Sequence, residues 1–204
     1  MSNVVYLERI QATAPRESVM FRLGYKKGKT EITPEQQKSV DGGIKAGEML
    51  CDLKGAYEIV PIDSFRDNSV ILDNGVALKS TQLSELFKGC DDVLLMAATA
   101  GPGIVERRDR EIKEGNAALG VILDAVGSET ADTGLDWMQD FISTQFAKKA
   151  RSITRRFSPG YGDLKLMAQK DIYNALKLDK IGIAITERCL LIPEKSVIAV
   201  AGIK

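Results

Sequence analysis

The pattern of apolar and polar residues first becomes helical after residue 32. From Val40 to about Leu53 the apolar side chains keep the spacing of one helix face. Thr33 is a favourable N-cap, Pro34 suits the first helical position, and Gln36 completes a capping box. The pattern therefore predicts a helix that begins beside Thr33.

The next apolar runs are short and partly β-branched, which is typical of strands. Ala56–Ile62 is the first of them, and Val93–Ala98 has the continuous apolar character of a buried strand. Between them, Val70–Leu72 and Val76–Leu78 flank Asp73-Asn74-Gly75, a turn sequence that favours a β-hairpin. This part of the chain is predicted to contribute strands to a sheet.

A long helical zone follows these strands. The charged stretch Glu106–Glu114 precedes Ala117–Val126, which is apolar on all sides and predicts a buried helix. Gly127 is expected to interrupt that helix. Beyond it, apolar residues at helical spacing between Leu135 and Phe146 predict a stripe that faces the core.

The C-terminal part returns to strands after one more helix. Ala168–Leu178 suits a helix, and three apolar segments then predict strands: Ile181–Thr186, Cys189–Ile192 and Val197–Ile203. The fold class predicted from all these patterns is α+β, with a twisted, mainly antiparallel sheet, helices packed on it and a helical N-terminal segment.

The domain organisation is expected to be simple. Residues 33–204 are predicted to form one domain, which their length allows. Residues 1–32 are expected to form an N-terminal arm, since residues 15–29 mix glycines with basic side chains and favour an irregular conformation.

Charge, hydrophobicity and cysteine content limit the classes of partner and the location to expect. The 28 basic and 28 acidic residues balance, which argues against nucleic acid or an anionic membrane surface as the main partner. No apolar run approaches the roughly 18 residues of a membrane span, and the N-terminus lacks a secretory signal pattern. Three scattered cysteines fit reduced thiols. We therefore expect a cytoplasmic protein.

The chain contains no histidine. This excludes a Ser-His-Asp triad, a Cys-His pair and HExxH zinc chemistry. Because the cysteines are also isolated, we expect no metal held by the protein, and no catalytic acid or base is predicted.

Candidate chemistry is densest in the stretch Arg155–Asp163. Pro159 and Gly160 favour a loop. Arg156 can bind a carboxylate with two parallel hydrogen bonds, and Tyr161 offers a flat face to a heterocycle or a cation. These groups suit a small zwitterionic ligand with an aromatic part. The alternative is a surface turn whose arginines are merely solvated.

Three carboxylates are further candidates. Glu129 and Asp132 are three residues apart and share a helix face. If they face inward, they should pair with an arginine or a ligand ammonium, because an unpaired buried carboxylate is costly; a solvated helix edge is the alternative. Glu187 follows a predicted strand and either reaches the same site or pairs with Arg188 at the edge.

The turn Gly101-Pro102-Gly103 lies between a predicted strand and a predicted helix. It matches half of a dinucleotide-binding fingerprint. Glu106 stands where the third glycine belongs and would repel a pyrophosphate. A plain strand-to-helix turn is the simpler interpretation, and a nucleotide-dependent oxidoreductase is an alternative function.

The segment from Arg156 to Tyr161 reads Arg-Phe-Ser-Pro-Gly-Tyr and resembles the RxxxGY motif of the activation (reactivation) domain of cobalamin-dependent methionine synthase. The order downstream is similar as well: Ile181-Gly182-Ile183, then Thr186-Glu187, then Pro193 and Ser196-Val197. The resemblance covers about residues 117–203. It implies an activation-domain-like fold and a site for S-adenosylmethionine.

The resemblance also implies a part for each candidate residue. Arg156 would pair with the methionyl carboxylate, and Tyr161 would pack on the adenine or face the sulfonium. Ser158, Pro159 and Gly160 would offer backbone groups to the adenine or ribose. One of three carboxylates would hold the α-ammonium: Glu129, Asp132 or Glu187.

The implied function is support of methionine synthase in trans. In the family, the domain presents S-adenosylmethionine to a corrinoid oxidised to cob(II)alamin, while a flavodoxin-like donor supplies an electron. This chain lacks both histidine and the DxHxxG cobalamin motif, so the cobalamin is expected on a partner, the corrinoid-binding methionine synthase. The chain would be an accessory component with little chemistry of its own. The remaining alternative is a non-catalytic interaction protein that keeps the fold.

Overall fold

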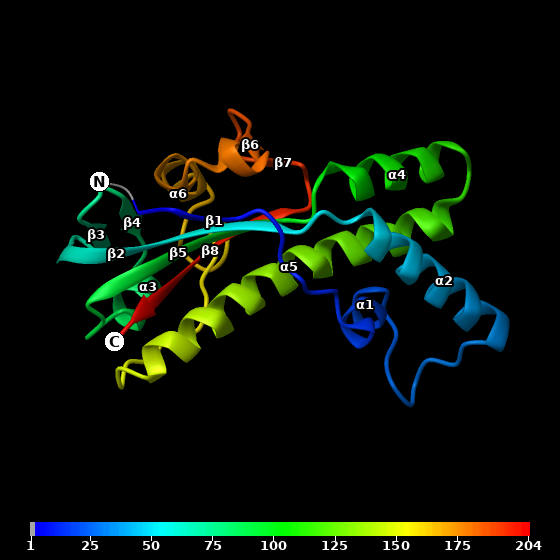
Figure 1. Cartoon of the computed structure of the whole chain (residues 1–204), viewed down its shortest axis with the longest axis horizontal. Coiled ribbons are helices and arrows are strands. Elements are labelled where there is room, and N and C mark those ends of the chain that lie inside the picture. Colours follow the sequence, from blue (N-terminus) through cyan, green and yellow to red (C-terminus); the bar gives the residue numbers. More distant parts are fainter. Residues whose placement is uncertain (1–2) are drawn as a thin grey trace.

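The structure is a computed structural model and describes residues 3–204. Its centre is a six-stranded sheet in the order β4-β3-β2-β5-β8, with β1 also paired to β2, and every pairing is antiparallel (Figure 1). A separate two-stranded sheet joins β6 to β7. The strands are β1 (Val5–Leu7), β2 (Lys54–Arg66), β3 (Ser69–Leu72), β4 (Ala77–Lys79), β5 (Asp92–Thr99), β6 (Ala184–Ile185), β7 (Leu191–Ile192) and β8 (Ser196–Ile203).

The central strand β5 separates two apolar layers because its side chains alternate between the faces of the sheet. Leu94 and Met96 pack against the second half of α5, whereas Val93 and Leu95 pack in the layer formed with α3 and α6. The helices are α1 (Arg16–Arg22), α2 (Pro34–Leu50), α3 (Thr81–Leu86), α4 (Pro102–Lys113), α5 (Ala117–Ala147) and α6 (Ala168–Leu176), with a 3-10 helix at Leu178–Ile181.

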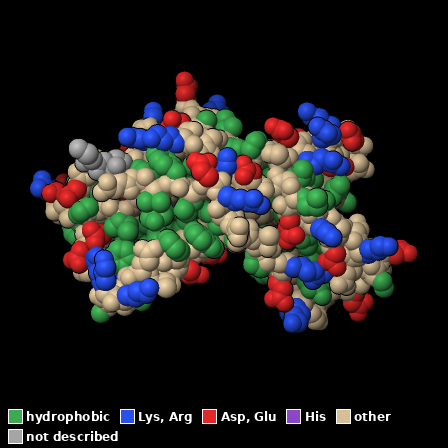
Figure 2. Space-filling model, in the orientation of Figure 1, with side chains coloured by type: hydrophobic (Ala, Val, Ile, Leu, Met, Phe, Trp, Pro, Cys, Tyr) green, Lys and Arg blue, Asp and Glu red, His purple; other side chains and the backbone are tan. Residues whose placement is uncertain are grey.

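The first half of α5 extends beyond the sheet and packs with α1, α2 and α4 around a third apolar cluster (Figure 1). The outline narrows between this helical part and the sheet part, and charged side chains are dense over the helical part (Figure 2). None of the helices within residues 3–204 combines the length and apolar character that crossing a membrane requires.

Most predicted elements are present, and the predicted α+β class with its antiparallel sheet is confirmed. Thr33 caps α2 in a complete capping box with Gln36. The predicted hairpin is formed by β3 and β4. Within the expected N-terminal arm, the prediction of an irregular conformation over residues 15–29 is wrong at Arg16–Arg22, which is helical and buries Val19 and Met20.

The predicted break at Gly127 is wrong, because α5 is one helix of 31 residues. A Cβ at Gly127 would lie 2.9 Å from Cγ of Lys195 and 3.3 Å from a methyl of Ile104. The glycine therefore makes room for the neighbouring side chains while the helix continues through it.

The strand expected over Ile181–Thr186 is reduced to the two residues of β6. Ile181 ends the 3-10 helix instead, and Gly182 has a left-handed conformation with φ of 78°. An αL residue breaks the extended backbone, so pairing with β7 starts only at Ala184.

Candidate functional site

The segment that leads into the candidate loop lies along the edge of β8. Thr154 N–H donates to the carbonyl of Gly202 at 2.9 Å, and Phe157 and Val200 exchange two backbone hydrogen bonds, each 2.9 Å long. These bonds hold the backbone of Arg155 and Arg156 beside the sheet. Both side chains therefore project from a fixed backbone.

After Phe157 the chain leaves the sheet in a compact turn. The N–H of Gly160 donates to Leu164 O at 2.8 Å, and that of Tyr161 donates to Ser158 O at 3.2 Å. Gly160 has a φ of 91°, a conformation that a residue with a Cβ resists. The Pro-Gly turn expected from the sequence is therefore present, and its backbone hydrogen bonds are made within the loop.

Asp163 anchors this loop to the start of α3. Its carboxylate accepts hydrogen bonds from the hydroxyl of Ser80 and from the N–H groups of Thr81 at 2.8 Å and Gln82 at 3.3 Å. The hydrogen bond from Ser80 lowers the pKa of Asp163, and the backbone donors lower it further. Gly162 leaves room for neighbouring side chains, since a Cβ there would lie 2.5 Å from Oε1 of Gln82 and 2.9 Å from Cζ of Phe157.

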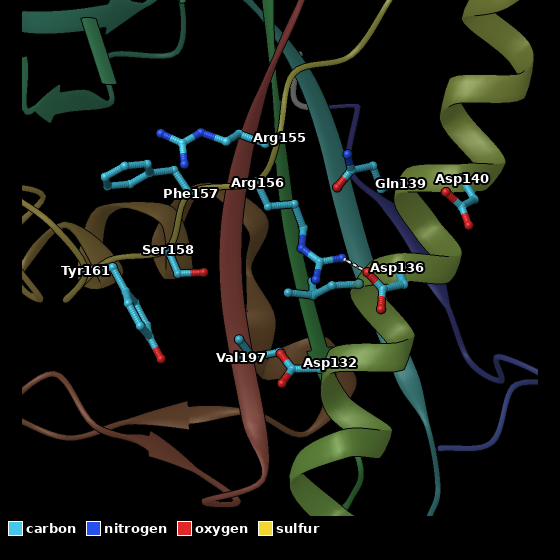
Figure 3. Close-up of a pocket in the computed structure, with 11 residues that line it drawn as sticks. Asp132, Asp136, Gln139, Asp140, Arg155, Arg156, Phe157, Ser158, Tyr161 and Val197 are labelled. Carbon is cyan, nitrogen blue, oxygen red and sulfur yellow. Dashed lines mark hydrogen bonds and ion pairs between the residues drawn. The ribbon is translucent and has the colours of Figure 1, made fainter. Parts of the chain in front are cut away.

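A cavity of about 610 Å³ lies between the loop, β8 and α5 (Figure 3). It has the size of a pocket for a small molecule. Its wall on α5 consists of residues spaced along one helix face, and its opposite wall is the loop. It is lined by Asp132, Leu135, Asp136, Gln139, Asp140, Arg155, Arg156, Phe157, Ser158, Tyr161 and Val197.

Arg156 projects from the loop side toward α5 and forms an ion pair with Asp136 (Figure 3). The Arg156 side chain is 24% exposed and that of Asp136 is 64% exposed. Arg155 extends the other way in the same view. Of the two arginines, Arg156 is thus the one whose guanidinium faces the acidic wall.

Asp132 lies one helical turn before Asp136 on the same wall. Burial raises its pKa, and the negative charge of Glu129 raises it further, whereas Arg22 and Arg156 act in the opposite direction. Glu129 does not line the cavity and pairs with Arg22 at 2.5 Å, and a second guanidinium nitrogen of Arg22 lies 3.3 Å from Asp132. The structure therefore places Asp132 on the wall of the cavity that Arg156 also lines, and pairs Glu129 with α1 outside it.

A second cavity, of about 580 Å³, adjoins the first. Ser158, Tyr161 and Val197 line both, and the Tyr161 side chain is 73% exposed between them. The second cavity extends over β8 to the β6–β7 hairpin. Its other lining residues are Pro159, Gln169, Thr186, Leu190, Leu191, Ile192, Glu194, Ser196 and Ile198.

Three predicted site residues line neither cavity, and one of them, Glu129, pairs with Arg22 instead. Gly160 is exposed at the loop tip, and Glu187 is exposed in the β6–β7 turn, where its neighbour Thr186 lines the second cavity. The sequence reasoning did not single out Asp136, although its place one turn after Asp132 was a signal for it. Val197 was named as a strand residue and in the downstream order that resembles the family, but not as a site residue.

An ionic cluster supports the far end of the second cavity. Lys195 lies 2.7 Å from Asp124 and donates to the hydroxyl of Ser128 at 3.0 Å. Arg108 binds Asp124 at 2.8 Å and Glu194 through two hydrogen bonds. The cluster connects α4 and α5 to the residues that precede β8. It therefore helps to hold the start of β8, whose residue Val197 lines both cavities.

The Gly101–Gly103 turn packs against protein. A Cβ on Gly101 would meet Cβ of Asp52 at 3.2 Å, and one on Gly103 would meet the carbonyl oxygen of Leu50 at 3.0 Å. The glycines thus accommodate the end of α2 and the entry to β2. Among residues 3–204, no group of three or more Cys, Asp or Glu side chains is placed to hold a metal ion.

No protein-family model and no curated protein matches this sequence. Among solved structures, the fold is similar to a crystal structure of the MetH reactivation domain bound to AdoHcy, with a TM-score of 0.72 and 11% sequence identity. The superposition covers 98% of this chain and 78% of that domain. At this level of identity the comparison establishes the architecture: the chain has the fold of the MetH reactivation domain.

Proposed function

We propose that this chain binds S-adenosylmethionine in the groove formed by the two adjoining cavities, and presents it to the corrinoid of a cobalamin-dependent methionine synthase on another polypeptide. The observation that supports this most strongly is the convergence of Arg156, Tyr161 and Asp132 on one cavity, in a fold whose solved counterpart holds AdoHcy. Residues from two distant parts of the sequence form this constellation.

The groups in the groove match the ends of the ligand. Arg156 is the partner for the methionyl carboxylate, because its planar guanidinium donates two parallel hydrogen bonds to such a group. Asp132 is the best placed of the three candidate carboxylates for the α-ammonium, because it alone lines the cavity. Tyr161, between the cavities, offers its ring to the adenine or the sulfonium.

The second cavity suits the nucleoside. Its surface is mainly apolar, from the β6–β7 hairpin and β8, and its smaller polar part comes from Ser158, Gln169, Thr186, Glu194 and Ser196. Such a lining, with a few polar contacts, is typical of pockets for heterocycles. Ser158 and Pro159 line it, so these residues remain our candidates for contacts to adenine or ribose.

In the proposed reaction the protein positions the methyl donor and does no acid–base chemistry. The partner's cob(II)alamin, after reduction by one electron from a flavodoxin-like donor, would accept the sulfonium methyl group, with methylcobalamin and S-adenosylhomocysteine as products. Holding the sulfonium in line with the acceptor raises its effective concentration. The chain would thus act as an accessory component of a methyltransferase system.

Calorimetric titration of the purified chain with S-adenosylmethionine, AdoHcy and NAD tests the binding part of the proposal. We expect the first two to bind and NAD not to bind. Arg156→Ala removes a hydrogen-bonded charge contact of about 1.5–3 kcal/mol, so affinity should fall by roughly 10- to 150-fold. Arg155→Ala is the matched control: Arg155 also lines the cavity but extends away from α5, so its loss should reduce affinity much less. Wild-type affinity in Arg156→Ala would refute the assignment of that residue.

The trans role needs a separate measurement. The chain would be added to a cob(II)alamin-containing methionine synthase without its own activation domain, together with S-adenosylmethionine and a reduced flavodoxin. Appearance of the methylcobalamin absorption spectrum only in the presence of the chain is the expected result. If the chain binds S-adenosylmethionine but methylcobalamin does not appear, the trans role is refuted and only the ligand-binding part of the proposal stands.

A further inference from the structure

The guanidinium assigned to the ligand carboxylate is already paired. Arg156 forms an ion pair with Asp136 inside the cavity, and both residues line it. The pair joins the loop to the middle of α5 across the space that a ligand would enter (Figure 3). The pair uses Nη1 of Arg156, so a ligand carboxylate that binds this side of the guanidinium has to displace Asp136.

Asp136 has acidic neighbours on both sides. Asp132 precedes it and Asp140 follows it by one helical turn each, and all three line the cavity. Arg22 lies against Asp132 at 3.3 Å. For Asp140, no ion pair is found within residues 3–204. If Asp136 lost Arg156, it would face two like charges and no cation of its own.

We propose that Asp136 makes the site selective for zwitterionic ligands through an exchange of ion pairs. The ligand carboxylate takes over Arg156, and the released Asp136 takes the ligand ammonium together with Asp132. This inference rests on the proposed function, since it concerns the amino-acid end of the same ligand.

The exchange favours a zwitterion for an electrostatic reason. A ligand with a carboxylate alone would leave Asp136 unpaired beside Asp132 and Asp140, and like charges at this spacing on a helix repel. A ligand with an amine alone would leave the Arg156–Asp136 pair in place. Its ammonium group would then lie beside the cation Arg156 and find Asp136 already paired. Only a ligand with both charges leaves Arg156, Asp136 and Asp132 each beside an opposite charge.

The existing pair is weak enough to be displaced. The Asp136 side chain is 64% exposed, and pairs with such access to water typically change an equilibrium by about two- to five-fold. The Arg156 side chain is more enclosed, at 24% exposed, and its backbone lies between hydrogen bonds to β8. The arginine therefore stays in place while its acidic partner is exchanged.

The test compares three probes by calorimetry: AdoHcy, its deaminated analogue S-adenosyl-4-thiobutyrate, and its decarboxylated analogue S-adenosyl-3-thiopropylamine. In Asp136→Asn the competitor for Arg156 is gone, so the deaminated analogue should bind about two- to five-fold tighter than to the wild type. AdoHcy gains by the same factor but loses an ammonium partner worth about ten-fold in affinity, so it should bind about two- to five-fold more weakly. The preference for AdoHcy over the deaminated analogue should fall by about ten-fold.

The matched control is Asp140→Asn, the same charge change one turn further along the same wall. It removes a like charge but no ion pair with Arg156, so the preference for AdoHcy should fall by clearly less than in Asp136→Asn. Equal preferences in wild type and Asp136→Asn would overturn the exchange while leaving the proposed function intact. Failure of wild type to bind AdoHcy at all would overturn both.

Discussion

Gly47 in α2 lies against α5, and replacing it with alanine perturbs the contact between these helices in a predictable direction. A Cβ at this position would lie 2.9 Å from Cγ1 and 3.0 Å from Cβ of Val126. Valine is branched at Cβ and has little rotamer freedom in a helix, so it cannot turn away from the added methyl group. One helix would have to move relative to the other.

Two opposing effects determine the size of the change. Alanine is favoured over glycine inside a helix by about 1 kcal/mol, whereas inserting a methyl group into a packed contact costs about 1–3 kcal/mol. We therefore expect Gly47→Ala to lower the free energy of unfolding by about 1 kcal/mol. Gly42 is the matched control on the same helix: it is exposed and has no atom within 4 Å of its Cβ position, so Gly42→Ala should stabilise by about 1 kcal/mol.

Urea denaturation followed by circular dichroism measures both variants, and thermal melting gives a second value. For a chain of this size, 1 kcal/mol corresponds to about 2–4 °C in Tm. Opposite signs for the two substitutions are the expected result. A Gly47→Ala variant as stable as Gly42→Ala would show that α2 and α5 do not approach as closely as described.

Two further predictions concern the loop and the ionic cluster. Asp163→Ala should release the candidate loop from α3 and weaken AdoHcy binding by about ten-fold, measured by calorimetry, and unchanged affinity would show that the loop needs no anchor. Burial alone would raise the pKa of Asp124, but hydrogen bonds from Lys195 and Arg108 hold this pKa below its ordinary value. Its contribution to stability is therefore present above the unfolded-state pKa of about 3.9 and lost as pH falls through the lower folded-state value. The Tm difference between wild type and Asp124→Asn should accordingly be largest near neutral pH and shrink in acid; a gap independent of pH would contradict this assignment.

Local chemistry made several elements predictable. The capping box at Thr33 specifies the start of α2 because its hydrogen bonds involve only neighbouring residues. The Asp73-Asn74-Gly75 turn specifies a hairpin for the same reason. The antiparallel sheet followed from the short apolar runs that these signals separate.

The wrong prediction at Gly127 shows what local sequence patterns do not contain. Gly127 was interpreted as a helix break because its intrinsic helix propensity is poor. In the structure it lies in the middle of α5 and faces Lys195, a residue far away in the sequence. The reason for a glycine at this position is the neighbouring side chain, which only the folded chain brings there.

The sequence by itself determined the chemistry of the loop from Arg156 to Tyr161, since proline, glycine and the motif act through adjacent residues. It did not determine which carboxylate faces that loop. Glu129, Asp132 and Asp136 all lie on α5, and the choice between them depends on how the helix is rotated against β8 and on where Arg22 of α1 binds. Helix rotation is set by packing of apolar side chains across the sheet, so only the tertiary structure decided that Arg156 meets Asp136.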